Sequence, residues 1–196
     1  AVGFLKAQLA EKELTGIGKP FIHNSKHLSV ICQWASTFEE CLQAYTCGIH
    51  NIEGGTQITG FYAAMLKAFN EVSPKKLKTA DIKCGMMGFV NVKLAEAQYK
   101  GQTKEKLMSP VDKDVAAELY PELKKWLTSN KSMLKTIVKR ALEIRKANEE
   151  VSKLMKAASS VKNSGVKGAM LPGILATADP KTPASERELF LVEGDS

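Results

Sequence analysis

The residues best suited to chemistry lie in a polar loop at 99–106, which reads Tyr-Lys-Gly-Gln-Thr-Lys-Glu-Lys. An apolar run at 86–94 precedes it and predicts a strand, and a Ser-Pro pair after it suggests the start of a helix. Gln102 and Lys104 are two positions apart, so in an extended backbone their side chains would point to the same side. A side-chain amide and an ammonium group that converge in this way can bind an anion. An ordinary solvated loop has the same composition, so other segments must decide between the two readings.

Two further segments carry candidate residues. Residues 53–56 read Glu-Gly-Gly-Thr and open a predicted helix, whose free amides could hold an anion, although packing is the simpler role. Residues 189–196 read Leu-Phe-Leu-Val-Glu-Gly-Asp-Ser, an apolar strand that ends in Glu193. A glutamate at a strand end can act as a general acid or base and as a hard oxygen ligand for magnesium.

In this order, and with a Leu-Pro-Gly triplet at 171–173, these segments resemble the ATPase subunit of type IIA DNA topoisomerases, which includes DNA gyrase B (GyrB) and the topoisomerase IV subunit ParE. The resemblance covers residues 30–196. It implies an α+β fold of the ribosomal protein S5 domain 2-like type, known as the transducer domain, with a long C-terminal helix. It also implies a left-handed crossover, against the usual right-handed preference.

The same resemblance implies roles for three residues. Gln102 and Lys104 would contact the γ-phosphate of ATP, and Lys104 would act in catalysis by offsetting the charge that develops on the transferred group. Glu193 would be the catalytic and magnesium-binding acid at the start of the TOPRIM domain, which acts on DNA phosphodiesters. The sequence lacks the preceding ATPase domain and the paired aspartates of TOPRIM, so we expect half a nucleotide site and no activity or bound cofactor in this chain alone. Gln57 and Cys84 replace a histidine and an acidic residue common in the family.

The parent implied by the resemblance is an ATP-dependent, magnesium-requiring DNA isomerase. Its partners would be double-stranded DNA and a tyrosine-bearing subunit, and with ATP it would form a homodimer. Two alternatives remain open at this point: a non-catalytic S5-like nucleic-acid-binding module, and a fragment of a mismatch-repair protein of the MutL type. The Leu-Val-Glu-Gly-Asp-Ser ending argues against both.

The positive charge of the chain is concentrated in one segment. The formal net charge is +7, and residues 131–167 hold ten basic and three acidic side chains. Such a segment suggests a nucleic-acid-binding surface, with Lys139, Arg140, Arg145 and Lys146 as the DNA-binding candidates. The alternative is a solvated helix face rich in lysine.

Composition excludes several other classes. With 44% hydrophobic residues, the 196-residue chain can bury a core. No run reaches the eighteen or so apolar residues of a membrane span, and the N-terminus lacks a signal peptide, so we expect a soluble intracellular protein. The resemblance implies a cytoplasmic, nucleoid-associated one. The four cysteines lack C-x-x-C spacing and there are three histidines, which favours buried reduced thiols over a zinc or redox site.

Periodicity predicts the elements that position these residues. Residues 28–34 and 44–49 are expected to form an antiparallel strand pair, and helix 56–72 with strand 86–94 completes a strand-helix-strand unit. Long helices are predicted at 110–128 and 131–159. The predicted regions are an N-terminal helix and linker at 1–20, the transducer domain at 21–160, a second linker at 161–188 and the start of TOPRIM at 189–196. The missing N-terminal methionine suggests a piece of a larger protein.

Overall fold

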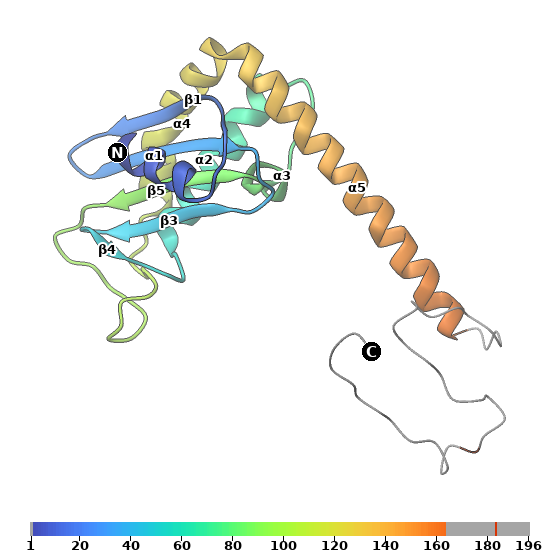
Figure 1. The fold of residues 1–196 in the computed structure, drawn as a ribbon. Coiled ribbons are helices and arrows are strands. Elements are labelled where there is room, and N and C mark those ends of the chain that lie inside the picture. The colour runs from blue at the N-terminus through green and yellow to red at the C-terminus, as the bar shows by residue number, and fades with distance from the viewer. Residues whose placement is uncertain (1, 164–182, 184–196) are drawn as a thin grey trace. The chain divides into compact units, whose positions relative to one another are not determined.

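A computed structural model describes residues 2–163 and residue 183 of the chain, with side chains described as far as Met155 (Figure 1). Residues 1–146 form one compact unit and residues 147–196 a second, and each is treated separately below. The described elements are α1 (Val2–Glu11), β1 (Gly16–Asn24), β2 (Leu28–Ala35), β3 (Cys41–Thr46), β4 (Ile49–His50), α2 (Thr56–Val72), α3 (Thr79–Lys83), β5 (Met86–Val92), α4 (Asp112–Ser129) and α5 (Lys131–Asn163). The α+β prediction is confirmed.

The sheet is mixed, in the order β1-β2-β5-β3-β4. β5 lies between β2 and β3: it pairs antiparallel with β2 and parallel with β3. The predicted antiparallel pair of 28–34 with 44–49 is therefore wrong. The two segments are near in sequence, but each finds its hydrogen-bond partner in β5. The strand-helix-strand prediction is confirmed, because α2 connects the two parallel strands β3 and β5 through the short β4.

β1 was missed in the sequence. Its Gly and Pro residues were expected to end the first helix and form a linker, whereas they lie inside a strand that pairs with β2. The register shifts between Ile17 and Phe21, which identifies an irregularity there. Gly18 has φ 70, and a Cβ at this position would lie 2.4 Å from the Met133 side chain. The strand thus accommodates Gly18 where α5 packs closely against it.

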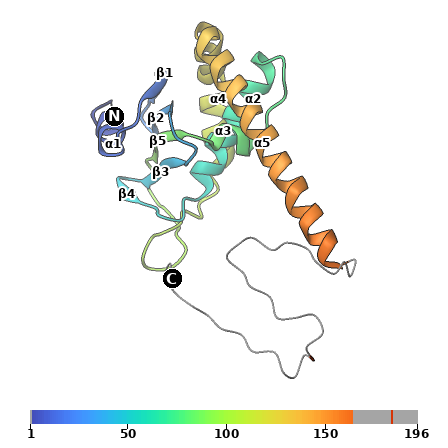
Figure 2. The same cartoon turned by 45° about the vertical axis from the view of Figure 1, so that its right-hand side comes forward.

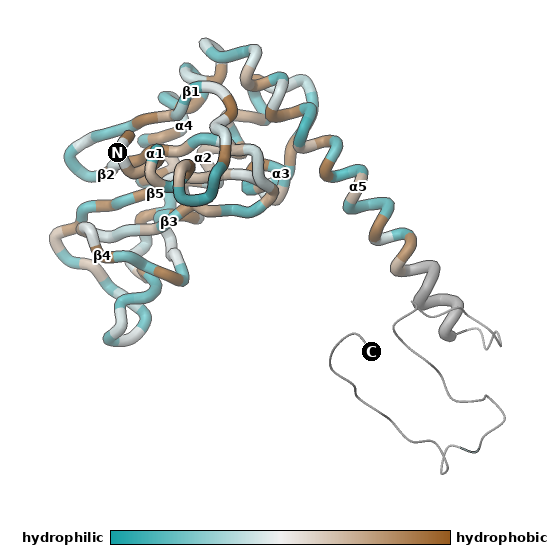
Figure 3. Tube along the Cα trace, viewed as in Figure 1, coloured by the Kyte–Doolittle hydropathy of each residue, from teal (hydrophilic) through white to brown (hydrophobic). Residues whose placement is uncertain are grey.

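Two clusters fill the two faces of the sheet. Because alternate side chains of a strand point to opposite faces, β2 contributes to both. The main core lies between the sheet and the helices α2, α4 and α5 (Figure 2), and among its fully buried members are Leu28, Cys32, Trp34, Phe61, Met65, Phe69, Met86, Val90, Leu119 and Leu123. α1 covers part of the other face, where Leu5 packs with Ile31, Ala35 and Met87. In Figure 3 the loop that follows β5 is largely hydrophilic, in contrast to the strands.

α5 is buried along its first turns. Met133, Leu134, Ile137, Val138 and Ala141 are each at most 8% exposed and belong to the main core. The predicted apolar stripe continues along the helix, but Val151, Leu154 and Met155 are 48%, 70% and 68% exposed. Burial of the stripe in the described residues therefore stops near the point where the first compact unit ends. No described helix is long and apolar enough to cross a membrane.

Candidate functional site

The loop between β5 and α4 is held against the start of α2. Leu107 forms isolated bridges with Gly55 and with Tyr99. Its amide donates to Gly54 O at 3.1 Å, and its carbonyl accepts from Thr56 N at 3.4 Å. Gly55 has φ 143, and a Cβ there would lie 2.5 Å from Leu107 O. The glycine pair that the sequence suggested for packing thus allows a close backbone contact between the two segments.

Asn51 fixes the tip of this loop. Its side chain is 1% exposed, and its Nδ2 donates to Lys104 O at 2.8 Å. Its Oδ1 accepts hydrogen bonds from Thr46 Oγ1 at 2.7 Å and from Gln57 Nε2 at 3.0 Å. One buried amide therefore connects β3, the start of α2 and the backbone of Lys104. Sequence reasoning missed Asn51, since an isolated Asn after a strand gives no signal of a partner 53 residues away.

Gln102 and Lys104 are both exposed at the tip of the loop. The backbone is not extended here, because Gly101 and Lys104 have φ 74 and 55 and turn the chain, so the expectation of two side chains aligned by an extended backbone is wrong. Lys104 Nζ lies 5.8 Å from the centroid of the Tyr99 ring. Among the described residues, neither the Gln102 amide nor the Lys104 ammonium has a hydrogen-bond or ion-pair partner. Both groups are available to an anion.

The four DNA-binding candidates of α5 differ in their surroundings. Lys139 and Lys146 are exposed, and Lys139 forms only a loose ion pair with Glu143, at 3.9 Å. Arg140 instead donates to the carbonyls of Ala35, the last residue of β2, and of Thr37, in the loop between β2 and β3.

Arg145 makes its polar contacts with α3 and the segment before it. Its Nε lies 3.2 Å from Asp81 Oδ1, its Nη2 pairs with Asp81 Oδ2, and Nη2 also donates to Lys76 O at 3.4 Å. The Asp81 side chain is 8% exposed, so this is a largely desolvated ion pair. Both arginines therefore attach the part of α5 that lies in the first unit to other segments of that unit.

Metal and thiol chemistry have little support in the described part of the chain. Those residues include no group of three or more His, Cys, Asp or Glu side chains that could hold a metal ion, and Glu193 lies outside them. The four cysteines are free thiols, but the expectation that they are buried holds for Cys32 alone: Cys47 is exposed, and Cys41 and Cys84 are half-buried. Burial raises the pKa of the Cys32 thiol, which keeps it protonated.

Comparison with known proteins decides the family. The sequence profile described as DNA gyrase B matches residues 4–157. The chain belongs to the DNA gyrase B family. The B subunit of DNA gyrase from Archaeoglobus fulgidus is 35% identical over 176 residues, and that from Borreliella burgdorferi is 32% identical over 183 residues. These alignments cover 86% and 88% of this chain but only 27% and 28% of the relatives.

Solved structures show the same fold. The 43K ATPase domain of Thermus thermophilus gyrase B, in complex with an aminocoumarin, matches 79% of this chain and 45% of its own, with a TM-score of 0.65 and 23% identity. The topoisomerase IV ATP-binding domain of Francisella tularensis matches 74% and 42%, with a TM-score of 0.60 and 24% identity. The resemblance to the ATPase subunits of type IIA topoisomerases is thus confirmed for this gyrase B family chain.

Proposed function

We propose that this chain is the transducer region of an ATP-dependent type IIA DNA topoisomerase subunit, with an S5-like fold, and that it couples ATP binding and hydrolysis to DNA strand passage. The observation that supports this most is the loop of Gln102 and Lys104. Two exposed donors that have no hydrogen-bond or ion-pair partner among the described residues are carried on a tip whose backbone is held by buried Asn51. Membership of the gyrase B family disfavours both alternatives, the nucleic-acid-binding module and the MutL-type fragment.

Lys104 and Gln102 would complete a nucleotide site whose remaining residues lie in another part of the parent. ATP, with its Mg²⁺, would supply the γ-phosphoryl group that is transferred to water. The donor set fits this group, because an ammonium and an amide both donate to phosphate oxygens. Lys104 would place its positive charge near the transferred γ-phosphoryl group, and Gln102 would orient that group. The turn at Gly101–Lys104, anchored by Asn51, would keep both donors in place before the nucleotide arrives.

The further parts of the proposal follow from the family resemblance. The parent would act in the cytoplasm on the nucleoid, with a tyrosine-bearing subunit, and would dimerise when ATP binds. Glu193 would be the magnesium-binding acid of a TOPRIM domain that begins at residue 189. On α5, exposed Lys139 and Lys146 would contact DNA phosphates, while Arg140 and Arg145 attach the helix to the transducer unit.

The test is Lys104→Ala in the full-length parent. Charge on the transferred group is greatest in the transition state, so the substitution should lower the ATP turnover rate about a hundredfold or more and weaken nucleotide binding far less. Steady-state ATPase assays and calorimetry with a non-hydrolysable ATP analogue measure the two effects. Lys106→Ala, on the same loop, is the matched control and should retain activity. A Lys104→Ala enzyme with near-normal turnover would contradict the proposal.

A further inference from the structure

The helix α2 has polar contacts at both ends. At its amino end, Thr56 Oγ1 donates to Ser109 O at 2.5 Å, and Gln57 Nε2 donates to Asn51, which itself donates to Lys104 O. The first turn of α2 is therefore bonded directly to the chain that follows the loop and, through Asn51, to Lys104 within the loop.

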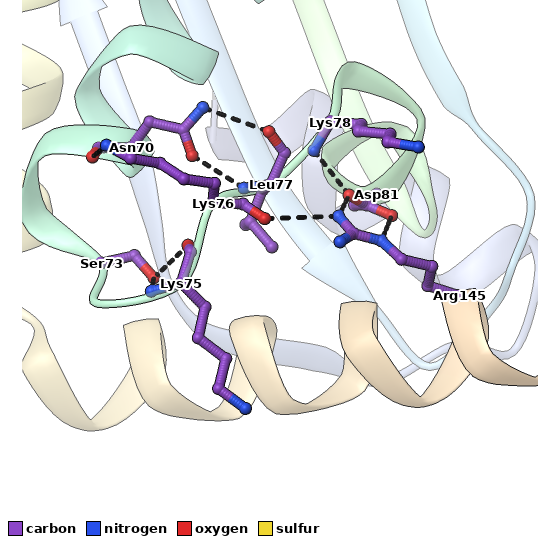
Figure 4. Close-up of polar contacts among 8 residues, drawn as sticks. All are labelled: Asn70, Ser73, Lys75, Lys76, Leu77, Lys78, Asp81 and Arg145. Carbon is purple, nitrogen blue, oxygen red and sulfur yellow. Dashed lines mark hydrogen bonds and ion pairs between the residues drawn. The ribbon is translucent and has the colours of Figure 1, made fainter.

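At its carboxyl end, α2 is bonded to the segment that leads into α3 (Figure 4). Asn70 exchanges two hydrogen bonds with the backbone of Leu77, at 2.7 and 3.1 Å, and its own carbonyl accepts from Lys76 Nζ at 2.7 Å. This segment and α3 are in turn bonded to α5, because Arg145 donates to Lys76 O and pairs with Asp81 of α3. Asp81 also accepts from Lys78 N at 2.6 Å.

Between these ends, α2 is a rigid element. It has 17 residues, which corresponds to about 25 Å. Phe61, Met65, Ala68 and Phe69 on its inner face are fully buried, and packed interiors transmit displacement rather than absorb it. A shift imposed at one end is thus passed on to the contacts at the other.

We propose that α2 transmits a displacement of the Gln102–Lys104 loop to α5, and that Asn70, Asp81 and Arg145 are the positioning residues at its far end. This inference rests on the proposed function, since it specifies how the nucleotide-sensing loop would act on the helix. Arg145 is suited to the role because it lies just beyond Ala141, where burial of the α5 stripe stops. The largely desolvated pair with Asp81 would hold α5 at that point more firmly than an exposed pair.

Arg145→Met in the full-length parent is the decisive variant. It removes the charge but keeps the aliphatic stem, and Asp81→Asn is a milder second variant that keeps an acceptor for Lys78 N. The matched control is Arg140→Met, which also removes a guanidinium of α5, but one bonded to the end of β2 and the loop after it rather than to the segment that follows α2. ATPase activity is measured with and without duplex DNA, and circular dichroism confirms that each variant is folded.

We expect basal ATPase activity to be retained in all three variants. The stimulation by DNA should fall about threefold or more in Arg145→Met, less in Asp81→Asn, and should persist in Arg140→Met. Hydrogen exchange then measures whether a change at the loop reaches α5. Adding a non-hydrolysable ATP analogue should change protection at both 99–107 and 141–150 in the wild type, but only at 99–107 in Arg145→Met.

Two results would overturn the inference. One is undiminished stimulation by DNA in folded Arg145→Met. The other is an equal loss of stimulation in Arg140→Met, which would show that removing any contact of α5 has this effect, whether or not it lies on the route through α2. A different result overturns the proposed function itself. If Lys104→Ala retained the ATPase activity of the wild type, and if DNA did not stimulate the wild type, there would be no coupling for α2 to transmit.

Discussion

At the residue scale, Asn51 is the buried side chain that binds the tip of the loop. Asn51→Ala removes the partner of two buried groups, the Thr46 hydroxyl and the Gln57 amide, and of the Lys104 carbonyl, whose hydrogen bond is partly buried. Leaving buried polar groups unpaired costs about 1–3 kcal/mol each, although water that enters can recover part of this. We predict a lower midpoint of thermal unfolding and faster hydrogen exchange at 99–107.

The control for this prediction is Asn130→Ala, which removes one hydrogen bond, to Trp126 O at the end of α4. It should leave exchange at 99–107 unchanged. If Asn51→Ala also left that exchange unchanged, the loop would not depend on Asn51 and the proposed preorganisation of Lys104 would lose its support.

At the scale of elements, the local sequence pattern predicted individual helices and strands but not how the strands pair. α2 and β5 were identified correctly because apolar residues recur at helical spacing in one and run continuously in the other. The partner of β2 could not be identified in this way, since β5 begins about fifty residues further along the chain. β1 was missed because Gly18 and Pro20 normally mark a turn. The candidate loop was found by its composition, but its attachment through Asn51 is a tertiary contact that no spacing encodes.

The contact between α2 and α4 gives a prediction about helix packing. A Cβ on Gly60 would lie 2.3 Å from Asp112 O at the start of α4. Gly60→Ala should therefore destabilise the fold by about 1–3 kcal/mol through overpacking, even though alanine favours a helix by about 1 kcal/mol over glycine. Gly3→Ala in α1 is the control, because nothing lies within 4 Å of its added methyl, and it should be neutral or stabilising. Denaturant unfolding measures both, and a Gly60→Ala chain as stable as the wild type would contradict the close contact.

At the scale of the whole molecule, the distribution of charge matters more than its sum. The chain carries a net charge of +7, but the two arginines of α5 among the four candidates make contacts within the first unit. The charges available to a polyanion on this helix are thus those of exposed lysines. The chain also spans little more than a quarter of its curated relatives, so catalysis and strand passage belong to the proposed parent, whereas duplex binding can be examined on the chain itself.

Lys139 and Lys146 provide the test of that distribution. If both contact DNA phosphates, duplex affinity should be independent of sequence and fall linearly on a log-log plot against salt, with a slope of about −0.9 per phosphate neutralised. Reversing both lysines to glutamate should make the slope shallower by about two units. Reversing Lys19 and Lys26, which lie at β1 and the turn after it, changes the net charge equally and should alter the slope much less. Fluorescence anisotropy at several salt concentrations measures both slopes. Equal changes in the two double variants would assign the binding to net charge alone, because a binding surface formed by Lys139 and Lys146 must respond more strongly to their reversal than to reversal of Lys19 and Lys26.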